Sequence, residues 1–300
     1  MIRQFQAQIT TPLTETFDFK NMGLSTTTIP GTLSFCTNRR FLAEILGNPN
    51  ISSLFLAPDI DRAEIPDHIP CVVVSDPSAV FYAVYAQWVA RLPKFNVRTR
   101  IAETAKIHPT AVISDHNVVI EDSVEIGPYV VILDHVSIGE GTKIASHTVI
   151  GNQGFIVKSI EGAPNRRLHH LGHVRIGRYV DIGSHCAIDL GCFGEATMID
   201  DYVAIDNLCH IAHEVHIGSN SIITAGAVFA GRVDLKTHVW IGPNATLCNQ
   251  VVVGDHGKVT IGSMAVDSVP ANETVTGFWA QPHQQFKRRY LGLFRDQVKK

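Results

Sequence analysis

The most regular feature of the sequence is an apolar residue that returns every six positions after residue 100. The period is interrupted near residues 114, 151 and 189 and is otherwise regular. The apolar positions are Ile101, Ile107, Ile113, Ile120, Ile126, Ile132, Ile138, Ile144, Ile150, Ile176, Ile182, Ile188, Ile199, Ile205, Ile211, Ile217, Ile223, Phe229, Leu235, Ile241, Leu247 and Val253. A period of six matches neither an ordinary strand nor a helix, so it indicates a structural repeat.

Small residues occupy fixed places within each six-residue unit. Glycine often follows the apolar residue, and a small or β-branched residue stands four places after it. A short strand and a tight turn fit such a unit, and three units close one coil of a triangular prism. The twenty-two units therefore predict a mainly β protein built on about seven coils of a parallel β-helix.

The pattern divides the chain into three expected domains. Residues 1–98 lack the period and carry short apolar runs and a helical stretch that starts near Pro77, which predicts a small α/β domain. Residues 99–270 form the repeat domain, with an inserted loop over 151–175. Residues 271–300 combine apolar and basic side chains and predict a C-terminal helix.

Composition narrows the class of protein. Apolar residues make up 45% of the chain and charged residues 18%, which excludes wholesale disorder, and the net charge of −3 does not suggest nucleic-acid binding. No apolar run reaches the ~18 residues of a membrane span, and the first residues do not resemble a signal peptide. We therefore expect a cytoplasmic protein. Its six cysteines form no CxxC motif and are expected to be buried, without metal or tightly bound cofactor.

The chain has fifteen histidines, which raises the question of metal binding. The densest group falls on successive faces of the predicted prism, so one metal cannot easily take all three side chains from one chain. Zinc held between subunits, as in β-helical carbonic anhydrases, is an alternative. The dense group is His210, His213 and His216, and the histidines of the inserted loop, expected at the surface, are His169, His170 and His173.

His213 stands out because of the residue one coil above it. It lies near a predicted corner, and Gly231 follows eighteen residues later, which is one full coil. An imidazole beside a backbone N–H suits a general base paired with an oxyanion donor. Asp206 lies about one face earlier and could orient the ring, or serve as a turn residue.

Several segments resemble the UDP-3-O-(3-hydroxyacyl)glucosamine N-acyltransferase family. IDNLCHIAHEVHIG, followed by TAGAVFAG, is similar to that family's segment around the catalytic histidine, and LSFCTNRRF is similar to its uridine-binding segment. VVVSDPSAVFYAV, GNQGF, AIDLG and QPHQQFKRR match as well. The resemblance implies a left-handed coil, a homotrimer, and acyl transfer to the amine of a UDP-amino sugar in lipid A biosynthesis.

The resemblance also implies roles for particular residues. His213 is the general base and Gly231 the oxyanion donor. The donor is an acyl-phosphopantetheine thioester on an acyl carrier protein, attacked directly by the sugar amine. The residues implied to bind the substrate are Phe35, Asn38 and Phe41, around the uracil, and Phe155; without the resemblance, the two aromatic residues of the first segment would be assigned to a core.

Two positions depart from the family pattern. Gln250 stands where the family has a second histidine near the site, and it can donate a hydrogen bond but cannot carry a proton at neutral pH. Leu190 stands where the family has an arginine. The base and the uracil segment are retained. Two alternatives therefore stay open: an N-acyltransferase that acts on another amino sugar nucleotide from acyl-CoA or acetyl-CoA, and a non-catalytic protein that binds nucleotide sugars.

Overall fold

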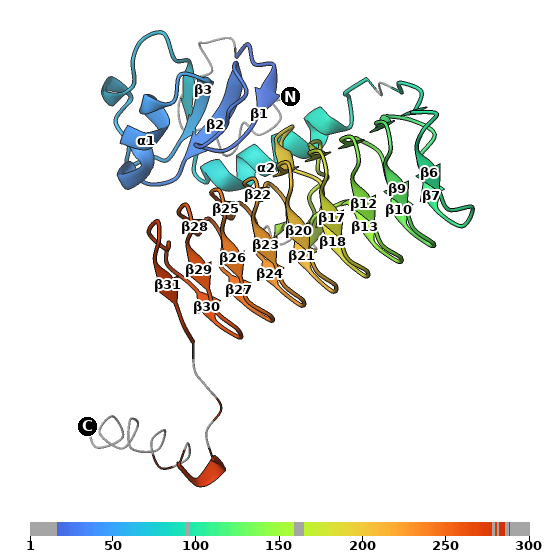
Figure 1. Ribbon diagram of the computed structural model, residues 1–300. Helices are drawn as coiled ribbons and strands as arrows, with labels where there is room; N and C mark the ends of the chain where they lie inside the picture. The colour runs from blue at the N-terminus through green and yellow to red at the C-terminus, as the bar shows by residue number, and fades with distance from the viewer. Residues whose placement is uncertain are drawn as a thin grey trace.

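The computed structural model describes residues 17–93, 96–158, 165–277, 280, 282–285 and 288. Figure 1 shows a long prism of stacked coils, with a small sheet and its helices against one side. Three parallel sheets form the faces of the prism, and neighbouring strands in each sheet come from successive coils. The predicted hexapeptide β-helix is confirmed.

The three faces contain eight, eight and nine strands. The first face consists of β7 (Val112–Ile113), β10 (Val131–Ile132), β13 (Val149–Asn152), β18 (Ala187–Asp189), β21 (His210–Ile211), β24 (Val228–Phe229), β27 (Thr246–Leu247) and β30 (Met264–Ala265). The second face consists of β5 (Arg100–Ile101), β8 (Val118–Ile120), β11 (Val136–Ile138), β16 (His173–Ile176), β19 (Ala196–Ile199), β22 (His216–Ile217), β25 (Asp234–Leu235) and β28 (Val252–Val253). The third face consists of β6 (Lys106–Ile107), β9 (Glu125–Ile126), β12 (Lys143–Ile144), β17 (Asp181–Ile182), β20 (Ala204–Ile205), β23 (Ile222–Ile223), β26 (Trp240–Ile241), β29 (Lys258–Val259) and β31 (Thr274–Val275).

The six-residue period places one apolar side chain per face inside the prism. Ile211, for example, pairs with Ile188 below and Phe229 above, and all three are buried. The small or β-branched residue four places on, such as Cys209 or Val215, fills the same core. Because the spacing is identical in successive coils, equivalent apolar residues stack on one another, and the core is continuous along the prism.

The corners of the prism require an unusual backbone conformation. Residues such as Glu214, Arg232 and Gln250 have φ between 59° and 64°, in the left-handed region. Non-glycine residues adopt it only where the surrounding structure demands it. Because corners stack coil upon coil, their side chains form columns along the edges of the prism.

The prism is longer than the count from the sequence. That count stopped at Val253, but Val259, Ala265 and Val275 continue the inward positions in β29, β30 and β31. Val259 and Ala265 keep the six-residue spacing, so the signal was present, although the small side chain of Ala265 weakens it. The last prism strand lies beyond residue 270.

The inserted loop leaves the coil between β13 and β16. Its described part includes a two-stranded antiparallel ladder of β14 (Val157–Lys158) and β15 (Arg166–Arg167). Leu168 at the end of this excursion is buried with residues of the N-terminal sheet. The insertion therefore packs against the other part of the molecule.

The N-terminal part is a four-stranded parallel sheet in the order β1-β2-β3-β4. Asp76 caps helix α2 by accepting a hydrogen bond from the Ala79 N–H, and Pro77 occupies the first turn, as expected from the sequence. The elements are β1 (Asn21–Met22), β2 (Thr32–Cys36), β3 (Ile51–Leu56), β4 (Cys71–Val73), the 3₁₀ helices η2 (Arg39–Phe41) and η3 (Arg62–Glu64), and the helices α1 (Leu42–Gly47) and α2 (Pro77–Val89).

Helix α2 lies between the sheet and the prism (Figure 1). Its Phe81 and Tyr85 share one buried cluster with Phe55 of β3 and with Phe193, which lies in the loop between β18 and β19. The Tyr85 hydroxyl donates to the His169 carbonyl at 2.9 Å. A shared aromatic core therefore joins the two parts.

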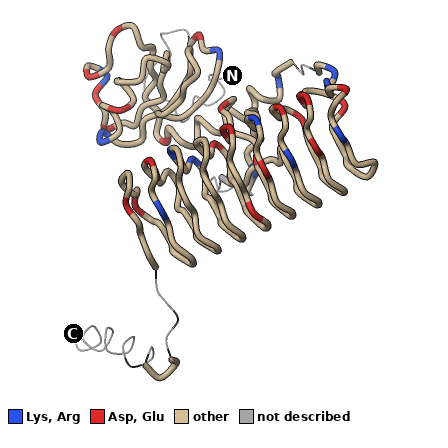
Figure 2. Tube along the Cα trace, in the orientation of Figure 1, with Lys and Arg blue, Asp and Glu red and all other residues tan. Residues whose placement is uncertain are grey.

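Charge is mixed over both parts of the molecule. Figure 2 shows acidic and basic residues interspersed along the prism and around the sheet. No helix among the described residues is long and apolar enough to cross a membrane. Most of the expected C-terminal helix over 271–300 lies outside the described residues.

Candidate functional site

His213 lies at the corner that joins β21 to β22, and its ring covers Gly231 of the next coil. A Cβ added to Gly231 would stand 2.5 Å from Nε2 of His213, far inside contact distance. The coils are tied here because Arg232 N–H donates to the His213 carbonyl at 3.0 Å. The expected stacking of His213 on Gly231 is present, and only glycine leaves space for the ring.

Glu214, not Asp206, orients the imidazole. His213 Nδ1 lies 3.1 Å from Glu214 Oε2, and Arg232 Nε donates to the same oxygen at 3.1 Å. Asp206 instead accepts from the backbone and side-chain N–H groups of Asn207. Asp206 is thus a turn residue, because its corner is one face away. The left-handed conformation of Glu214 turns its side chain back toward the preceding histidine.

The environment of Glu214 keeps its carboxylate ionised. Burial would raise the pKa of this carboxyl, but the hydrogen bond with His213 and the charge of Arg232 outweigh burial and hold the pKa below its usual range. An ionised carboxylate can only accept, so Nδ1 of neutral His213 carries the proton. Nε2 is then the basic nitrogen, on the side of the ring that faces Gly231.

The backbone N–H of Gly231 donates to no acceptor within the described part of the chain. Gln250 lies one coil higher in the same corner column, and its N–H donates to the Gly231 carbonyl at 3.1 Å. Its side chain is exposed. The column therefore brings together His213, Gly231 and Gln250, as expected from the sequence, and adds Glu214 and Arg232, which sequence reasoning missed.

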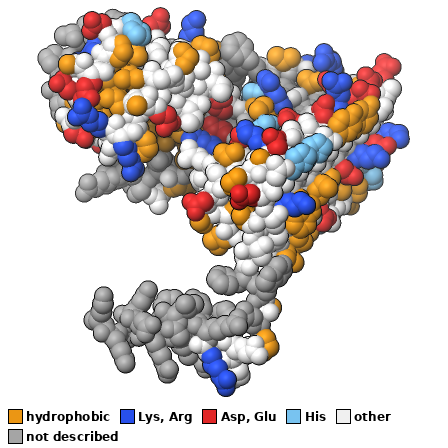
Figure 3. Space-filling view, turned by 60° about the vertical axis from the view of Figure 1, so that its left-hand side comes forward, with side chains coloured by type: hydrophobic (Ala, Val, Ile, Leu, Met, Phe, Trp, Pro, Cys, Tyr) orange, Lys and Arg blue, Asp and Glu red, His pale blue; other side chains and the backbone are white. Residues whose placement is uncertain are grey.

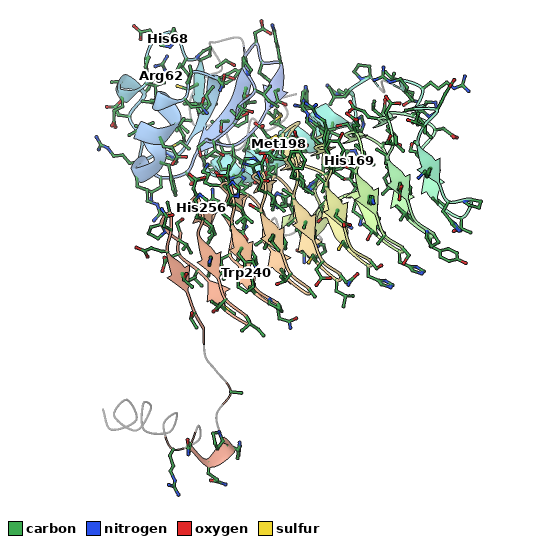
Figure 4. All side chains as sticks on the ribbon, viewed as in Figure 1. Arg62, His68, His169, Met198, Trp240 and His256 are labelled. Atoms are coloured by element: carbon green, nitrogen blue, oxygen red, sulfur yellow. The ribbon has the colours of Figure 1, made fainter. Side chains whose placement is uncertain are left out.

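A cavity of about 400 Å³ lies between the N-terminal sheet and the second face of the prism. Its prism wall includes Glu214, Arg232 and Gln250, and the opposite wall is the loop 23–28 after β1. Glu195, on the prism side, connects the two walls because its carboxylate accepts hydrogen bonds from Thr27 and Thr28 of the opposite wall. Figure 3 shows charged and histidine side chains on the prism surface beside the N-terminal part, and Figure 4 labels Met198 and His169 in the wider region where the sheet and the prism meet, although neither lines this cavity.

His216 lies on the wall of this cavity between two carboxylates. Nδ1 is 3.0 Å from Asp234 and Nε2 is 3.0 Å from Asp200. The hydrogen bond with Asp234 raises the pKa of His216, burial opposes it, and Asp200 adds to the increase. Both ring nitrogens donate, so His216 is favoured as an imidazolium that bridges three coils.

The three clustered histidines have separate partners. His210 lies 3.9 Å from the buried Asp189, whereas His213 and His216 contact the carboxylates described above. Burial raises the pKa of Asp189, although His210 and His213 partly offset it. The described residues include no group of three or more candidate ligands placed to hold a metal ion.

The expected uracil-binding residues lie in different surroundings. Phe35 packs against Phe81, with ring centroids 4.7 Å apart, and is half-buried against the shared core. Phe41 is exposed, and the Arg40 guanidinium lies 4.5 Å from its ring centroid. Asn38 caps the short helix η2 by accepting from the Arg40 N–H. The described residues show no direct ring contact between Phe35 and Phe41, and a uracil site between these two rings stays a prediction.

The inserted loop contains one exposed and one buried residue of interest. Phe155 is 78% exposed beside Arg167, free to contact another molecule. His170 is only 1% exposed, so its expected place at the surface was wrong. It is buried because the insertion folds over the corner and packs the ring against His213, with centroids 5.4 Å apart. No period in the sequence could have signalled this contact.

Comparison with known proteins identifies relatives of this chain. The model of the bacterial transferase hexapeptide repeat family matches residues 117–152. The chain is 31% identical to UDP-3-O-acylglucosamine N-acyltransferase from Delftia acidovorans over 267 residues, 83% of this chain and 76% of that protein. The Caulobacter sp. protein of the same name is 33% identical over 51% of this chain and 44% of its own length. Among solved structures, LpxA from Acinetobacter baumannii is 25% identical over 63% of this chain and 77% of that chain, with a TM-score of 0.44.

Proposed function

This chain belongs to the UDP-3-O-acylglucosamine N-acyltransferase family, and we propose that it transfers an acyl group from a thioester to the 2-amine of a UDP-amino sugar in lipid A biosynthesis. One observation supports the chemistry most directly. An imidazole is oriented by an ionised glutamate and packs against a glycine whose N–H donates to no acceptor among the described residues. That arrangement suits acyl transfer without metal or covalent intermediate.

In the proposed reaction the sugar amine attacks the thioester carbonyl. His213 Nε2 accepts a proton from the attacking nitrogen, and the Gly231 N–H stabilises the negative charge on the carbonyl oxygen. The C–S bond then breaks, and the proton held by His213 passes to the departing thiolate. Glu214 does not react; it is a positioning residue that fixes the tautomer and the ring plane.

The acceptor is proposed to occupy the cavity beside Glu214, Arg232 and Gln250. Arg232 is mostly engaged with Glu214, so the exposed amide of Gln250 is the free hydrogen-bonding group of this wall. Phe41, Asn38 and Phe155 are exposed and are proposed to contact substrate, whereas Phe35 is half-buried against the core and is proposed to support the segment. The proposal therefore assigns uracil recognition chiefly to Phe41.

The remaining parts of the proposal concern the setting of the reaction. We propose an acyl carrier protein as donor, a homotrimer as the active form and the cytoplasm as the location. We also keep the division into a uridine-binding part (1–98), an acyltransferase prism (99–270) and a C-terminal segment (271–300). The six cysteines are all free, which agrees with a reducing compartment.

The test measures thiol release from 3-hydroxyacyl carrier protein and from acetyl-CoA, each with UDP-3-O-acylglucosamine. We expect release with the carrier protein, and a decrease in turnover of about 10² to 10⁴ in His213→Ala. His238→Ala is the matched control, because His238 stacks on His256 in another corner column.

Release with acetyl-CoA alone would favour the alternative in which Gln250 accompanies a change of donor. Absence of release with both donors, in a protein that still binds the UDP-sugar, would contradict the proposal and favour a non-catalytic binding protein.

A further inference from the structure

His170 is held inside the protein by groups of its own loop. Its N–H donates to the side-chain oxygen of Gln153 at 2.7 Å, and Gln153 Nε2 donates to the His170 carbonyl at 3.3 Å. Gly154 leaves space for the ring, because a Cβ there would stand 2.9 Å from Nδ1 of His170. Arg167 braces the same turn by donating from Nε to the Gly154 carbonyl. The loop is thus built to deliver one imidazole to a defined place.

The tautomer of His170 follows from the one hydrogen-bond partner that its ring has among the described residues. Nδ1 lies 3.1 Å from the Leu190 carbonyl, which can only accept, so Nδ1 carries the proton. Nε2 is buried and has no hydrogen-bond partner within the described residues. Burial lowers the pKa of His170 and outweighs the hydrogen bond with the Leu190 carbonyl, which raises it; smaller contributions come from His213 and Arg167, which lower it, and from Glu214, which raises it. His170 is therefore a neutral ring.

The ring of His170 meets the ring of His213 almost at a right angle. The centroids are 5.4 Å apart and the planes are inclined by 79°, an edge-to-face arrangement. Glu214 and Gly231 already restrain His213 through Nδ1 and from one side of the ring. His170 supplies a further contact, from a segment that is far away in the sequence.

A buried ring nitrogen without a partner is unfavourable, and a wholly apolar side chain would avoid that loss. The structure nevertheless keeps an imidazole here, in contact with the proposed base. A neutral neighbour also leaves His213 free to accept a proton, whereas a charged one would oppose it.

We propose that His170 is a positioning residue for the general base: its neutral ring fixes the plane of His213 so that Nε2 stays aligned over Gly231 while the proton is transferred. This inference rests on the proposed function, because it concerns the same reaction. His170 does not contact the reacting atoms. It acts by limiting rotation of a side chain whose misplacement by about 1 Å can cost about 10²-fold in rate.

The test compares two substitutions with different chemistry. His170→Gln retains an N–H donor for the Leu190 carbonyl but removes the ring, and we expect kcat to fall by about 10-fold to 100-fold with KM for the UDP-sugar unchanged. His170→Phe retains a neutral ring edge and should keep kcat within about 3-fold of the unsubstituted protein. Thermal melting of both variants reports any loss of fold.

A purely structural role would lower the melting temperature and leave kcat per folded molecule unchanged in His170→Gln, which would overturn the inference. If His170→Phe does not fold, His170→Ala is assayed with added imidazole. Partial recovery of kcat, with none in His213→Gln under the same conditions, supports positioning, and no recovery overturns it. Lack of turnover in the unsubstituted protein would instead reject the proposed function, so the two failures are distinguishable.

Discussion

The corner at His213 and the segment around Phe41 were both identified from sequence, yet their side chains are arranged differently in the structure. His213 and Gly231 are one coil apart in a repeat, and the imidazole packs against the glycine. Phe35 in β2 and Phe41 in η2 are six residues apart, and one ring is half-buried against the core while the other is exposed. A repeat converts a fixed sequence separation into a stack, whereas the segment from β2 to η2 has no period from which the relative placement of two side chains could be predicted.

The same contrast appears within the catalytic corner itself. Glu214, Arg232 and Gln250 form a column because each occupies the corner position of its own coil. His170 reaches the corner from an insertion that no period describes. Repeat positions therefore supply the proposed base, its carboxylate partner and the proposed oxyanion donor, and the irregular loop supplies the proposed additional restraint.

Gly231→Ala should cause the largest loss of activity of the substitutions at the His213 corner. The added methyl group would collide with the His213 ring, so the ring must leave its position, and we expect kcat to fall by about 10² or more. Thiol release with saturating substrates measures the loss. Gly47→Ala is the control, since a methyl group there meets nothing within 4 Å. An active Gly231→Ala enzyme would show that the stacking is not required.

Paired alanine substitutions at Phe35 and Phe41 sharpen the contrast in the N-terminal part. Phe35→Ala removes core contacts with Phe81 and should lower the free energy of unfolding by about 2 kcal/mol. Phe41→Ala should change stability by less than about 0.5 kcal/mol but raise KM for the UDP-sugar. Urea unfolding and steady-state kinetics separate the two. Unchanged affinity in Phe41→Ala would remove this residue from the proposed uracil site.

Glu214→Gln tests the carboxylate that the structure adds to the corner. The amide can present an N–H as well as an oxygen to His213, so the tautomer is no longer specified, and we expect kcat to fall by about 10-fold. Glu140→Gln serves as the control, because Glu140 accepts from the Tyr179 hydroxyl away from the corner. Equal rates for both variants would mean that Gly231 and the packing around the ring suffice to orient His213.

The bridge of His216 between Asp200 and Asp234 should produce the smallest effect, a pH dependence of stability. The pKa of His216 is raised, so its stabilisation is complete below about pH 6.5 and is lost as pH increases through the folded-state value. The pKa of Asp234 is lowered, chiefly by the hydrogen bond with His216, so its stabilisation is lost as pH falls below about 3.8. The bridge is therefore strongest in mildly acidic solution.

Denaturant unfolding between pH 5 and pH 9 measures this effect. His216→Gln should flatten the decline in unfolding free energy toward pH 9, whereas His256→Gln, in the stacked pair with His238, should not. A decline of the same steepness in both variants would show that other groups control the alkaline limb.

Prediction from the sequence was most accurate where the chain is regular. Ile211 and Phe229 were placed inward by period alone, and the start of α2 by Pro77. Asp206 was left open between orienting the ring and serving as a turn residue, because distance along one coil does not show which way a corner side chain turns; its hydrogen bonds with Asn207 are those of a turn residue. Ala265 was missed because a methyl side chain carries little apolar signal.

The sequence by itself determined the β-helix, the inward residues and the stacking of His213 on Gly231, because a fixed period leaves one way to bury one apolar side chain per face. Only the tertiary structure decided that the side chains of Glu214 and Arg232 turn toward His213, that Phe35 packs half-buried against the core and that His170 is buried against the proposed base. The period places Glu214 and Arg232 at one corner but does not fix the direction of their side chains, and the contact of His170 joins segments whose separation follows no period. Packing and hydrogen-bond satisfaction decide both.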